Sequence, residues 1–236
     1  MSEFQSIRVS SEAGVAQLEL HRPERINALN KAMLLEINAA LDTLEADAAV
    51  RVIVLTGAGR GFSSGFDLKE QMERRPEGAK VWREVLDLDF STTMRFWDSP
   101  KPTIAAIHGA CMAGAFEMAL ACDLSVCSRD AVFGEPELKF GAGIVSRVVP
   151  VGEHLTTALR IARQMAVIDP DLVRDTKKAL NRSFEIQGMR AALDTALDID
   201  HAIESHGSPD KRKFMDIARD QGLKAALAWR EARFKV

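Results

Sequence analysis

The sequence predicts one α/β domain that continues into a helical C-terminal region. Three observations carry this prediction. Strand-like and helix-like patterns alternate over the first 150 residues, and glycine turns at Gly57 and Gly109 end two of the strands. Beyond this part every apolar pattern has helical spacing. We therefore place the α/β core at residues 1–150 and a helical region at 151–236.

The first elements follow from alternation and capping. Apolar residues alternate between Ile7 and Leu20 on either side of a Ser-Glu-Ala-Gly turn, which predicts two paired strands. Asn30 is a typical N-cap residue. The apolar face of the helix that it begins has helical spacing: Met33, Leu34, Ile37, Leu41 and Leu44. A continuous apolar strand, 52–55, then runs into the glycine-rich segment 57–61.

The remaining elements are read in the same way. A charged helical stretch covers residues 67–98. The segments after it are predicted as strand (102–107), helix (113–122), strand (124–127) and short strand (131–133). Asp169 and Ser208 each precede a proline, a pattern typical of helix starts. No linker separates the two predicted parts.

Composition excludes several classes of function. The chain of 236 residues has a formal net charge of −3 and no Lys/Arg block, which argues against nucleic acid as a partner. No apolar run reaches the length of a membrane span. Residues 1–5 resemble no secretory signal, and three cysteines in apolar surroundings suggest reduced thiols, so we expect a cytoplasmic protein. The metal-binding patterns CxxC and HExxH are absent from the sequence.

The first glycine-rich turn allows three interpretations. Gly57-Ala58-Gly59 lacks the third glycine of a dinucleotide fingerprint. Gly61-Phe62-Ser63-Ser64-Gly65 matches the nucleophile elbow of serine hydrolases, and Asp123 and His154 would complete the chain order of a triad. The strand, however, ends near Thr56, several residues before Ser63, whereas an elbow lies directly between strand and helix.

The third interpretation uses main-chain amides. Glycines near Phe66 let N–H groups turn toward a ligand. At the second turn, Gly114 opens a helix, whose first N–H groups are free and whose dipole favours negative charge. Two amides that converge on one oxygen form an oxyanion hole. Ordinary turn structure is the alternative for either turn alone.

An acidic residue follows the second turn. Glu117 is the only ionisable residue between Ala113 and Cys122, and it lies about one helical turn after Gly114. We expect burial among apolar neighbours to raise its pKa toward the range useful for acid/base catalysis, although a buried structural ion pair is the alternative. Glu137, in Glu135-Pro136-Glu137, lies 20 positions later.

At this point the chain resembles the enoyl-CoA hydratase/isomerase (crotonase) family. The resemblance runs from about Ser6 to Asn181, with many motifs in the expected order. The matching segments are His21-Arg22-Pro23, Asn27-Ala28-Leu29-Asn30, Leu55-Thr56-Gly57, Phe62 to Leu68, Lys101-Pro102, Ile107-His108-Gly109, Gly114 with Glu117, Ala121-Cys122-Asp123, Phe133 to Glu137 and Val148-Val149-Pro150.

The resemblance implies a crotonase-like spiral of strand–strand–helix units. It also implies that the amides of Phe66 and Gly114 are the oxyanion-hole donors. Glu117 and Glu137 would be the catalytic carboxylates that hold a water and add it to a 2-enoyl-CoA, giving a 3-hydroxyacyl-CoA. The residues implied in CoA binding are Glu24, Arg25, Ile26, Asp67, Leu68 and Lys69.

The family further implies a homotrimer or hexamer with residues 151–236 as the oligomerisation region. It also implies a place in fatty acid metabolism and no separate cofactor, because coenzyme A enters as part of the substrate. Double-bond isomerisation remains an alternative, because it needs only one working acid/base. A non-catalytic binding subunit is a second alternative.

The sequence also departs from the family pattern. Glu135 stands where hydratases usually have glutamine, and Phe66 replaces a common alanine. After Gly141 the chain passes almost at once into Ser146-Arg147-Val148-Val149-Pro150, which normally comes a few tens of residues later. We therefore expect a missing segment near 141–146. A continuous backbone there would instead mean a shortened acyl pocket.

Overall fold

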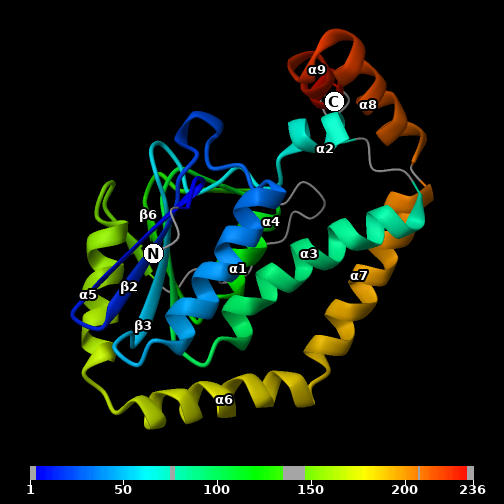
Figure 1. Cartoon of the computed structure of the whole chain (residues 1–236). Coiled ribbons are helices and arrows are strands. Elements are labelled where there is room, and N and C mark those ends of the chain that lie inside the picture. The colour runs from blue at the N-terminus through cyan, green and yellow to red at the C-terminus, as the bar shows by residue number, and fades with distance from the viewer. Residues whose placement is uncertain (1–3, 75–77, 135–146, 207, 233–236) are drawn as a thin grey trace. The chain divides into compact units, whose positions relative to one another are not determined.

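The computed structural model describes residues 4–74, 78–134, 147–206 and 208–232. The chain forms two compact units (Figure 1). The first comprises Met1–Phe66 and Asp89–Gln187, and the second comprises Asp67–Leu88 and Gly188–Val236. The predicted boundary at residue 150 marked the point after which every apolar pattern in the sequence is helical. The two units are instead defined by packing, and the first unit includes the two helices that follow residue 150.

The first unit is built on a six-stranded sheet of order β1-β2-β3-β4-β6-β8. Strand β1 pairs antiparallel with β2, and the other neighbours pair parallel. The strands are β1 (Ile7–Glu12), β2 (Val15–Leu20), β3 (Val52–Gly57), β4 (Thr103–Ile107), β6 (Leu124–Ser128) and β8 (Arg147–Val149). A parallel pair, β5 (Ala110–Met112) and β7 (Val132–Gly134), forms a separate small sheet.

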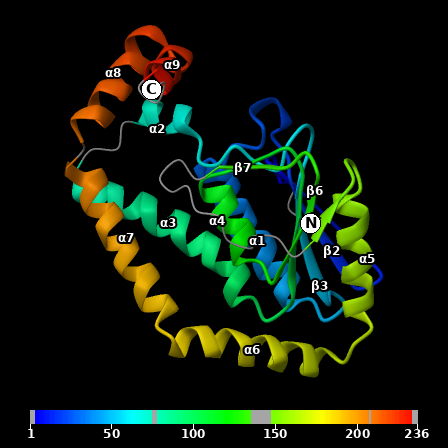
Figure 2. The ribbon, with the colours of Figure 1, turned by 180° about the vertical axis from the view of Figure 1, so that it is seen from behind.

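The central strands β3 and β4 of the sheet are buried on both faces. The helices of this unit are the short 3-10 helix η1 (Pro23–Arg25), α1 (Lys31–Ala46), α4 (Gly114–Ala121), α5 (His154–Ala166) and α6 (Pro170–Ile186). Helix α5 covers one face, and α1 and α4 lie on the other (Figures 1 and 2). Val52 and Val54 pack with Ala158 and Ala162 of α5. Because side chains alternate across a strand, the buried Ile53 and Leu55 point to the opposite face.

The second unit is helical. It contains α2 (Leu68–Arg74), α7 (Met189–His206), α8 (Pro209–Gln221) and α9 (Leu223–Ala232), and α3 (Ala79–Asp98) runs from it into the first unit. Within this unit Arg83 donates to Asp198 on α7, over 2.8 Å from Nη1 to Oδ1. In the described part of the chain, no helix is both long and apolar enough to cross a membrane.

The predicted caps are confirmed. The Asn30 side chain accepts from Met33 N, Asp169 from Asp171 N and Leu172 N, and Ser208 from Lys211 N. Strands β5 and β8 were not predicted. Each has only three residues, too few to produce a recognisable alternation.

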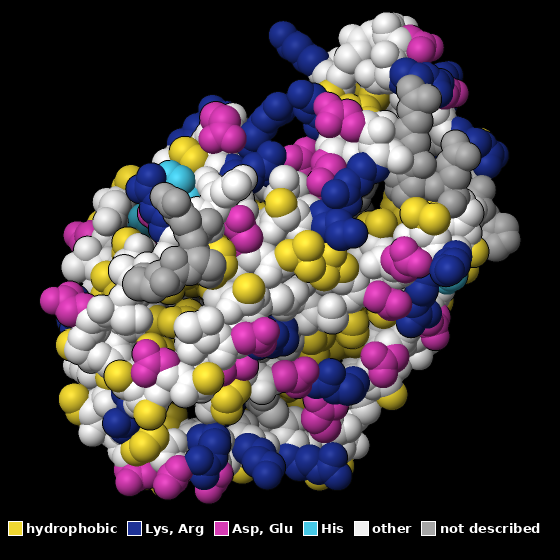
Figure 3. Space-filling view, viewed as in Figure 1, with side chains coloured by type: hydrophobic (Ala, Val, Ile, Leu, Met, Phe, Trp, Pro, Cys, Tyr) yellow, Lys and Arg dark blue, Asp and Glu magenta, His cyan; other side chains and the backbone are white. Residues whose placement is uncertain are grey.

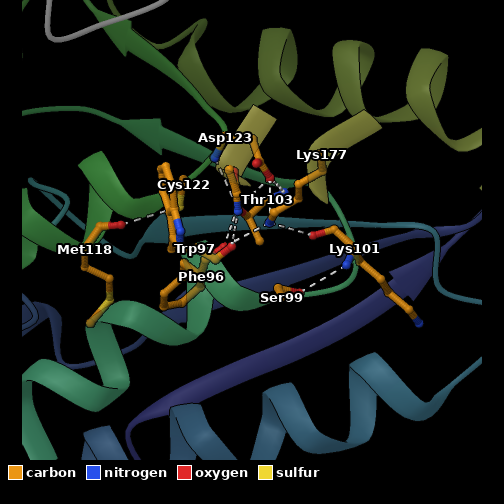
Figure 4. A network of polar contacts seen from close by, with 10 residues as sticks. Phe96, Trp97, Ser99, Lys101, Thr103, Met118, Cys122, Asp123 and Lys177 are labelled. Atoms are coloured by element: carbon orange, nitrogen blue, oxygen red, sulfur yellow. Dashed lines mark hydrogen bonds and ion pairs between the residues drawn. The ribbon is translucent and has the colours of Figure 1, made fainter. Parts of the chain in front are cut away.

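Helix α6 is anchored to the core by one buried ammonium group (Figure 4). Lys177 Nζ lies 2.9 Å from Asp123 Oδ2, 3.1 Å from Phe96 O and 3.2 Å from Lys101 O. The three acceptors match the three donors of the ammonium group. Asp123 Oδ2 also accepts from Thr103 N (2.7 Å), which ties the start of β4 to the same group.

Candidate active site

Asn27 fixes the loop that follows β3. It is fully buried with a φ of 51°, and its Nδ2 donates to Ala58 O, Gly61 O and Phe62 O over 2.8, 2.9 and 3.1 Å. Its Oδ1 accepts from Arg22 N (2.9 Å). The sequence placed Asn27 in a motif but gave no sign of this role, because the three carbonyls that its Nδ2 binds lie more than thirty residues away.

Ser63 is not arranged as a nucleophile. Its side chain is fully buried, and Oγ donates to Asn27 O over 2.8 Å and accepts from Gly65 N over 3.2 Å. A nucleophile elbow presents its serine to substrate. The geometry therefore gives Ser63 a structural role in the loop, and the serine-hydrolase interpretation has no support here.

The two glycine turns lie side by side. Ser63 N donates to Ala110 O (2.9 Å), and Met112 N donates back to Ser63 O (3.1 Å). These bonds continue the parallel pairing of the sheet into the turns. Two residues further on, Gly65 has a φ of +83°, and a β-carbon there would lie only 2.7 Å from Met112 O. Only glycine fits this close approach of two backbones.

The contact between the turns ends on the two predicted donors. The Phe66 ring lies against Gly114, so that a β-carbon built on Gly114 would overlap the ring atoms Cε2 and Cζ. Gly114 is the first residue of α4, where the main-chain N–H has no acceptor within the helix. The structure thus brings Phe66 and Gly114 together. That both N–H groups point to one oxygen stays a prediction.

The residue before this helix has a strained backbone. Ala113 has φ 47° and ψ −133°, a conformation rare for residues with a β-carbon. It is held on both sides: its N–H donates to Gly134 O of β7 (2.8 Å), and its carbonyl accepts from Phe116 N (2.7 Å) and Glu117 N (3.1 Å). Strain of this kind often accompanies functional turns.

Glu117 lies in the first turn of α4, as predicted, but its burial was predicted wrongly. It is exposed, whereas its neighbours Phe116 and Met118 are buried. The helix turns most of its apolar residues inward and this carboxylate outward, and Leu120 is exposed on the same helix. The predicted burial of this carboxylate is therefore wrong for this chain by itself.

Other predicted site residues fall in different places. Glu24 and Arg25 are exposed on η1, and Ile26 O accepts from Ser64 N (2.9 Å), which holds this segment against the first turn. Asp67, Leu68 and Lys69 belong to the second unit, where the Asp67 carboxylate accepts from Lys69 N over 3.1 Å and from Glu70 N over 3.2 Å. Glu135, Glu137 and the join at 141–146 lie outside the described residues.

A histidine pair near the glycine loop was not predicted. The rings of His108 and His154 stack with centroids 4.3 Å apart, and His108 Nε2 lies 2.9 Å from Gly59 O. Burial, followed by the nearby His108, lowers the pKa of His154 to about 4. A hydrogen bond from Ser128 lowers the pKa of the neighbouring Asp130. Within the described ranges, no three His, Cys, Asp or Glu side chains are grouped to hold a metal ion.

Comparisons with known proteins identify the family of this chain. The family model of the enoyl-CoA hydratase/isomerase family matches residues 10–142. A putative enoyl-CoA hydratase of Thermus thermophilus is 36% identical over 204 residues, which cover 70% of this chain and 80% of the relative. A hydroxycinnamoyl-CoA hydratase-lyase of Pseudomonas fluorescens is 27% identical over 269 residues, covering 95% of this chain and 96% of the relative.

That last alignment spans more positions than the 236 residues of this chain, so the relative carries segments that this chain lacks. That they fall near 141–146 stays a prediction. The crystal structure of an enoyl-CoA hydratase/isomerase from Xanthobacter autotrophicus Py2 superimposes with a TM-score of 0.96 at 50% identity, covering 99% of this chain and 100% of that one. The predicted crotonase fold is confirmed, and this chain belongs to the enoyl-CoA hydratase/isomerase family.

Proposed function

We propose that this protein hydrates a 2-enoyl-CoA to a 3-hydroxyacyl-CoA through a thioester enolate. The amides of Phe66 and Gly114 donate to the thioester oxygen. As water adds to the double bond, negative charge moves onto that oxygen, and two fixed N–H donors stabilise it more than they stabilise the substrate. The free first turn of α4 adds the favourable end of the helix dipole.

The pairing of the two turns is the observation that supports this proposal best. Main-chain hydrogen bonds at Ser63, the close approach of Gly65 to Met112 and the ring of Phe66 on Gly114 all join the same two segments. An oxyanion hole needs two donors that keep their separation without rearrangement during the reaction. Two turns locked together in this way meet that requirement.

Two carboxylates move the protons in the proposed reaction. Glu117, one turn after Gly114, and Glu137 hold the attacking water; one accepts its proton and the other delivers a proton to the α-carbon. Glu117 is exposed in this chain, so its carboxylate is accessible to a bound thioester and to the attacking water. Coenzyme A enters with the substrate, so the reaction needs no separate cofactor.

The residues proposed for CoA binding come from two segments of the chain. We assign this role to Glu24, Arg25 and Ile26 at η1 and to Asp67, Leu68 and Lys69 at the start of α2. The proximity of the first group to the Ser64 main chain supports its placement near the thioester.

We further propose a homotrimer or a hexamer of the chain. Helix α6 exposes large apolar side chains that a second copy would cover: Leu172, Leu180, Phe184 and Ile186. Cys111, Cys122 and Cys127 are buried thiols outside any disulfide, which suits a reducing compartment, and we propose a cytoplasmic enzyme of fatty acid metabolism.

A panel of enoyl-CoA thioesters tests the function. The loss of the conjugated enoyl absorbance reports hydration, and chain length and substituents are varied across the panel. Formation of a 3-hydroxyacyl-CoA supports the proposal. A shift of the double bond without uptake of water would replace it with isomerisation, and no turnover of any thioester would favour a binding subunit.

A further inference from the structure

Phe66 contacts the second oxyanion donor with its side chain as well as providing the first donor with its main chain. A β-carbon on Gly114 would overlap the Phe66 ring. Gly114 is not among the residues with positive φ, so its backbone would accept other residues. The ring, and not the backbone conformation, is therefore what requires glycine at this position.

The ring also lies where the backbone pairing of the two turns stops. Main-chain hydrogen bonds connect the segments at Ser63, and Gly65 touches Met112 two residues on. The next contact along both segments is Phe66 on Gly114. Phe66 is half-buried, and its ring fills the space between the last residue of one turn and the first residue of α4.

We propose that the Phe66 side chain is a positioning residue that sets the separation of the two donor amides. This inference rests on the proposed function, since it assumes that both amides serve one oxygen. The ring acts as a rigid spacer: it blocks the two turns from closing toward each other, and its contact with Gly114 keeps them from separating. Aromatic rings suit this role because they have few internal degrees of freedom.

Such a spacer acts on the transition state more than on substrate binding. Hydrogen bonds weaken steeply with distance and angle, and the enolate oxygen depends on them more than the neutral thioester does. Displacement of a catalytic group by about 1 Å can reduce a rate about a hundredfold. Most contacts of a CoA thioester lie far from this oxygen, so affinity for the substrate should change little.

Three variants test the spacer by steady-state kinetics. We expect Phe66→Ala to lower kcat about ten- to a hundredfold with KM within about threefold, and Phe66→Leu to recover most of kcat because it refills much of the space. Phe4→Ala is the matched control. Its side chain is half-buried like that of Phe66 but has no part in the proposed site or in the exposed apolar face of α6, and its loss should leave kcat unchanged. An unchanged kcat in Phe66→Ala would overturn the proposal.

A second measurement does not depend on turnover. A 3-ketoacyl-CoA is bound, and its near-ultraviolet enolate absorbance reports how well the two amides stabilise the negative oxygen. We expect the band to weaken in Phe66→Ala and to return in Phe66→Leu. If the wild-type protein hydrates nothing but these variants change the band as stated, hydration fails and the spacer stands. An unchanged band in Phe66→Ala overturns the spacer alone.

The steric part of the argument has its own test in urea unfolding. Gly114→Ala should lower the unfolding midpoint in the wild-type background, because the new methyl group meets the ring. In the Phe66→Ala background the same substitution should change the midpoint little, because the space is then open. Equal shifts of the midpoint in both backgrounds would show that the ring does not determine the residue at 114, and would overturn the proposal.

Discussion

Ser63 Oγ donates a hydrogen bond to the main-chain carbonyl of Asn27 over 2.8 Å, and both side chains are fully buried. The pair joins the loop after β3 to the turn before α1. Asn27 in turn holds three carbonyls of that loop. Because the Ser63 side chain is fully buried, it forms no part of the molecular surface, of which Figure 3 shows one face.

Ser63 should therefore be chemically inert. We expect Ser63→Ala to keep hydratase activity within a few fold and to lose about 1–2 kcal/mol of unfolding free energy, since it removes a buried hydrogen-bonding group. A fluorophosphonate probe followed by mass spectrometry checks the first point and urea unfolding the second. Stoichiometric labelling of Ser63 would restore the hydrolase interpretation.

The Lys177–Asp123 pair should be important for stability. We expect Lys177→Met to lower the unfolding free energy by about 3 kcal/mol, because Asp123 loses a partially buried partner and two carbonyls lose a donor. The neighbouring exposed Lys178→Met is a matched control and should stay within about 0.5 kcal/mol. Equal losses in the two variants would show that the anchor contributes nothing.

The sequence predicted the fold and the candidate site to different depths. Periodicity and caps located Asn30, Asp169 and Ser208, because these signals are local in the chain. The three-residue strands β5 and β8 exist only through long-range pairing and left no such signal. Similarly, no pattern predicted the Asn27 contacts.

The exposure of Glu117 shows a further limit. Composition of the surrounding helix suggested burial, but α4 covers the sheet with only one side. Which side of α4 faces the solvent, and so whether Glu117 is exposed, depends on the packing of the whole unit. The steric relation of Phe66 to Gly114 likewise depends on two turns that are nearly fifty residues apart.

The two glutamates should be separable by mutation. We expect Glu117→Gln and Glu137→Gln each to lower the rate of hydration about a hundredfold or more, the usual effect of losing a positioned acid/base. Steady-state kinetics on an enoyl-CoA measures this, and Glu70→Gln in α2 is a control that should retain the rate. Loss of activity in Glu117→Gln alone, with Glu137→Gln intact, would favour isomerisation.

Stability should fall in mild acid because of His154. Its pKa is about 4 in the folded protein against 6.5 as the ordinary value, so between these pH values the unfolded chain binds more protons. The unfolding free energy should therefore decrease as the pH falls from 6.5 toward 4. Urea midpoints at pH 7, 5.5 and 4.5 measure this decrease. His154→Gln should show a smaller decrease over the same range, and an identical pH dependence in the variant would contradict the assignment.

Ala113→Gly should stabilise the fold while slowing the enzyme. Ala113 has a φ of 47°, which glycine adopts without strain. Glycine also raises the entropy of the unfolded chain, which offsets part of this relief, so we expect a net gain in unfolding free energy of about 1 kcal/mol. The same change loosens the turn that presents the Gly114 amide, so kcat should fall severalfold with little effect on KM.

Ala13→Gly separates the two effects. Ala13 has a φ of 50° and lies exposed in the turn between β1 and β2, away from the glycine turns. Relief of strain alone predicts a similar gain in unfolding free energy with kcat unchanged. Urea unfolding and steady-state kinetics on both variants provide the comparison. A kcat that falls equally in Ala13→Gly and Ala113→Gly would mean that the strain at Ala113 has no specific connection with the oxyanion hole.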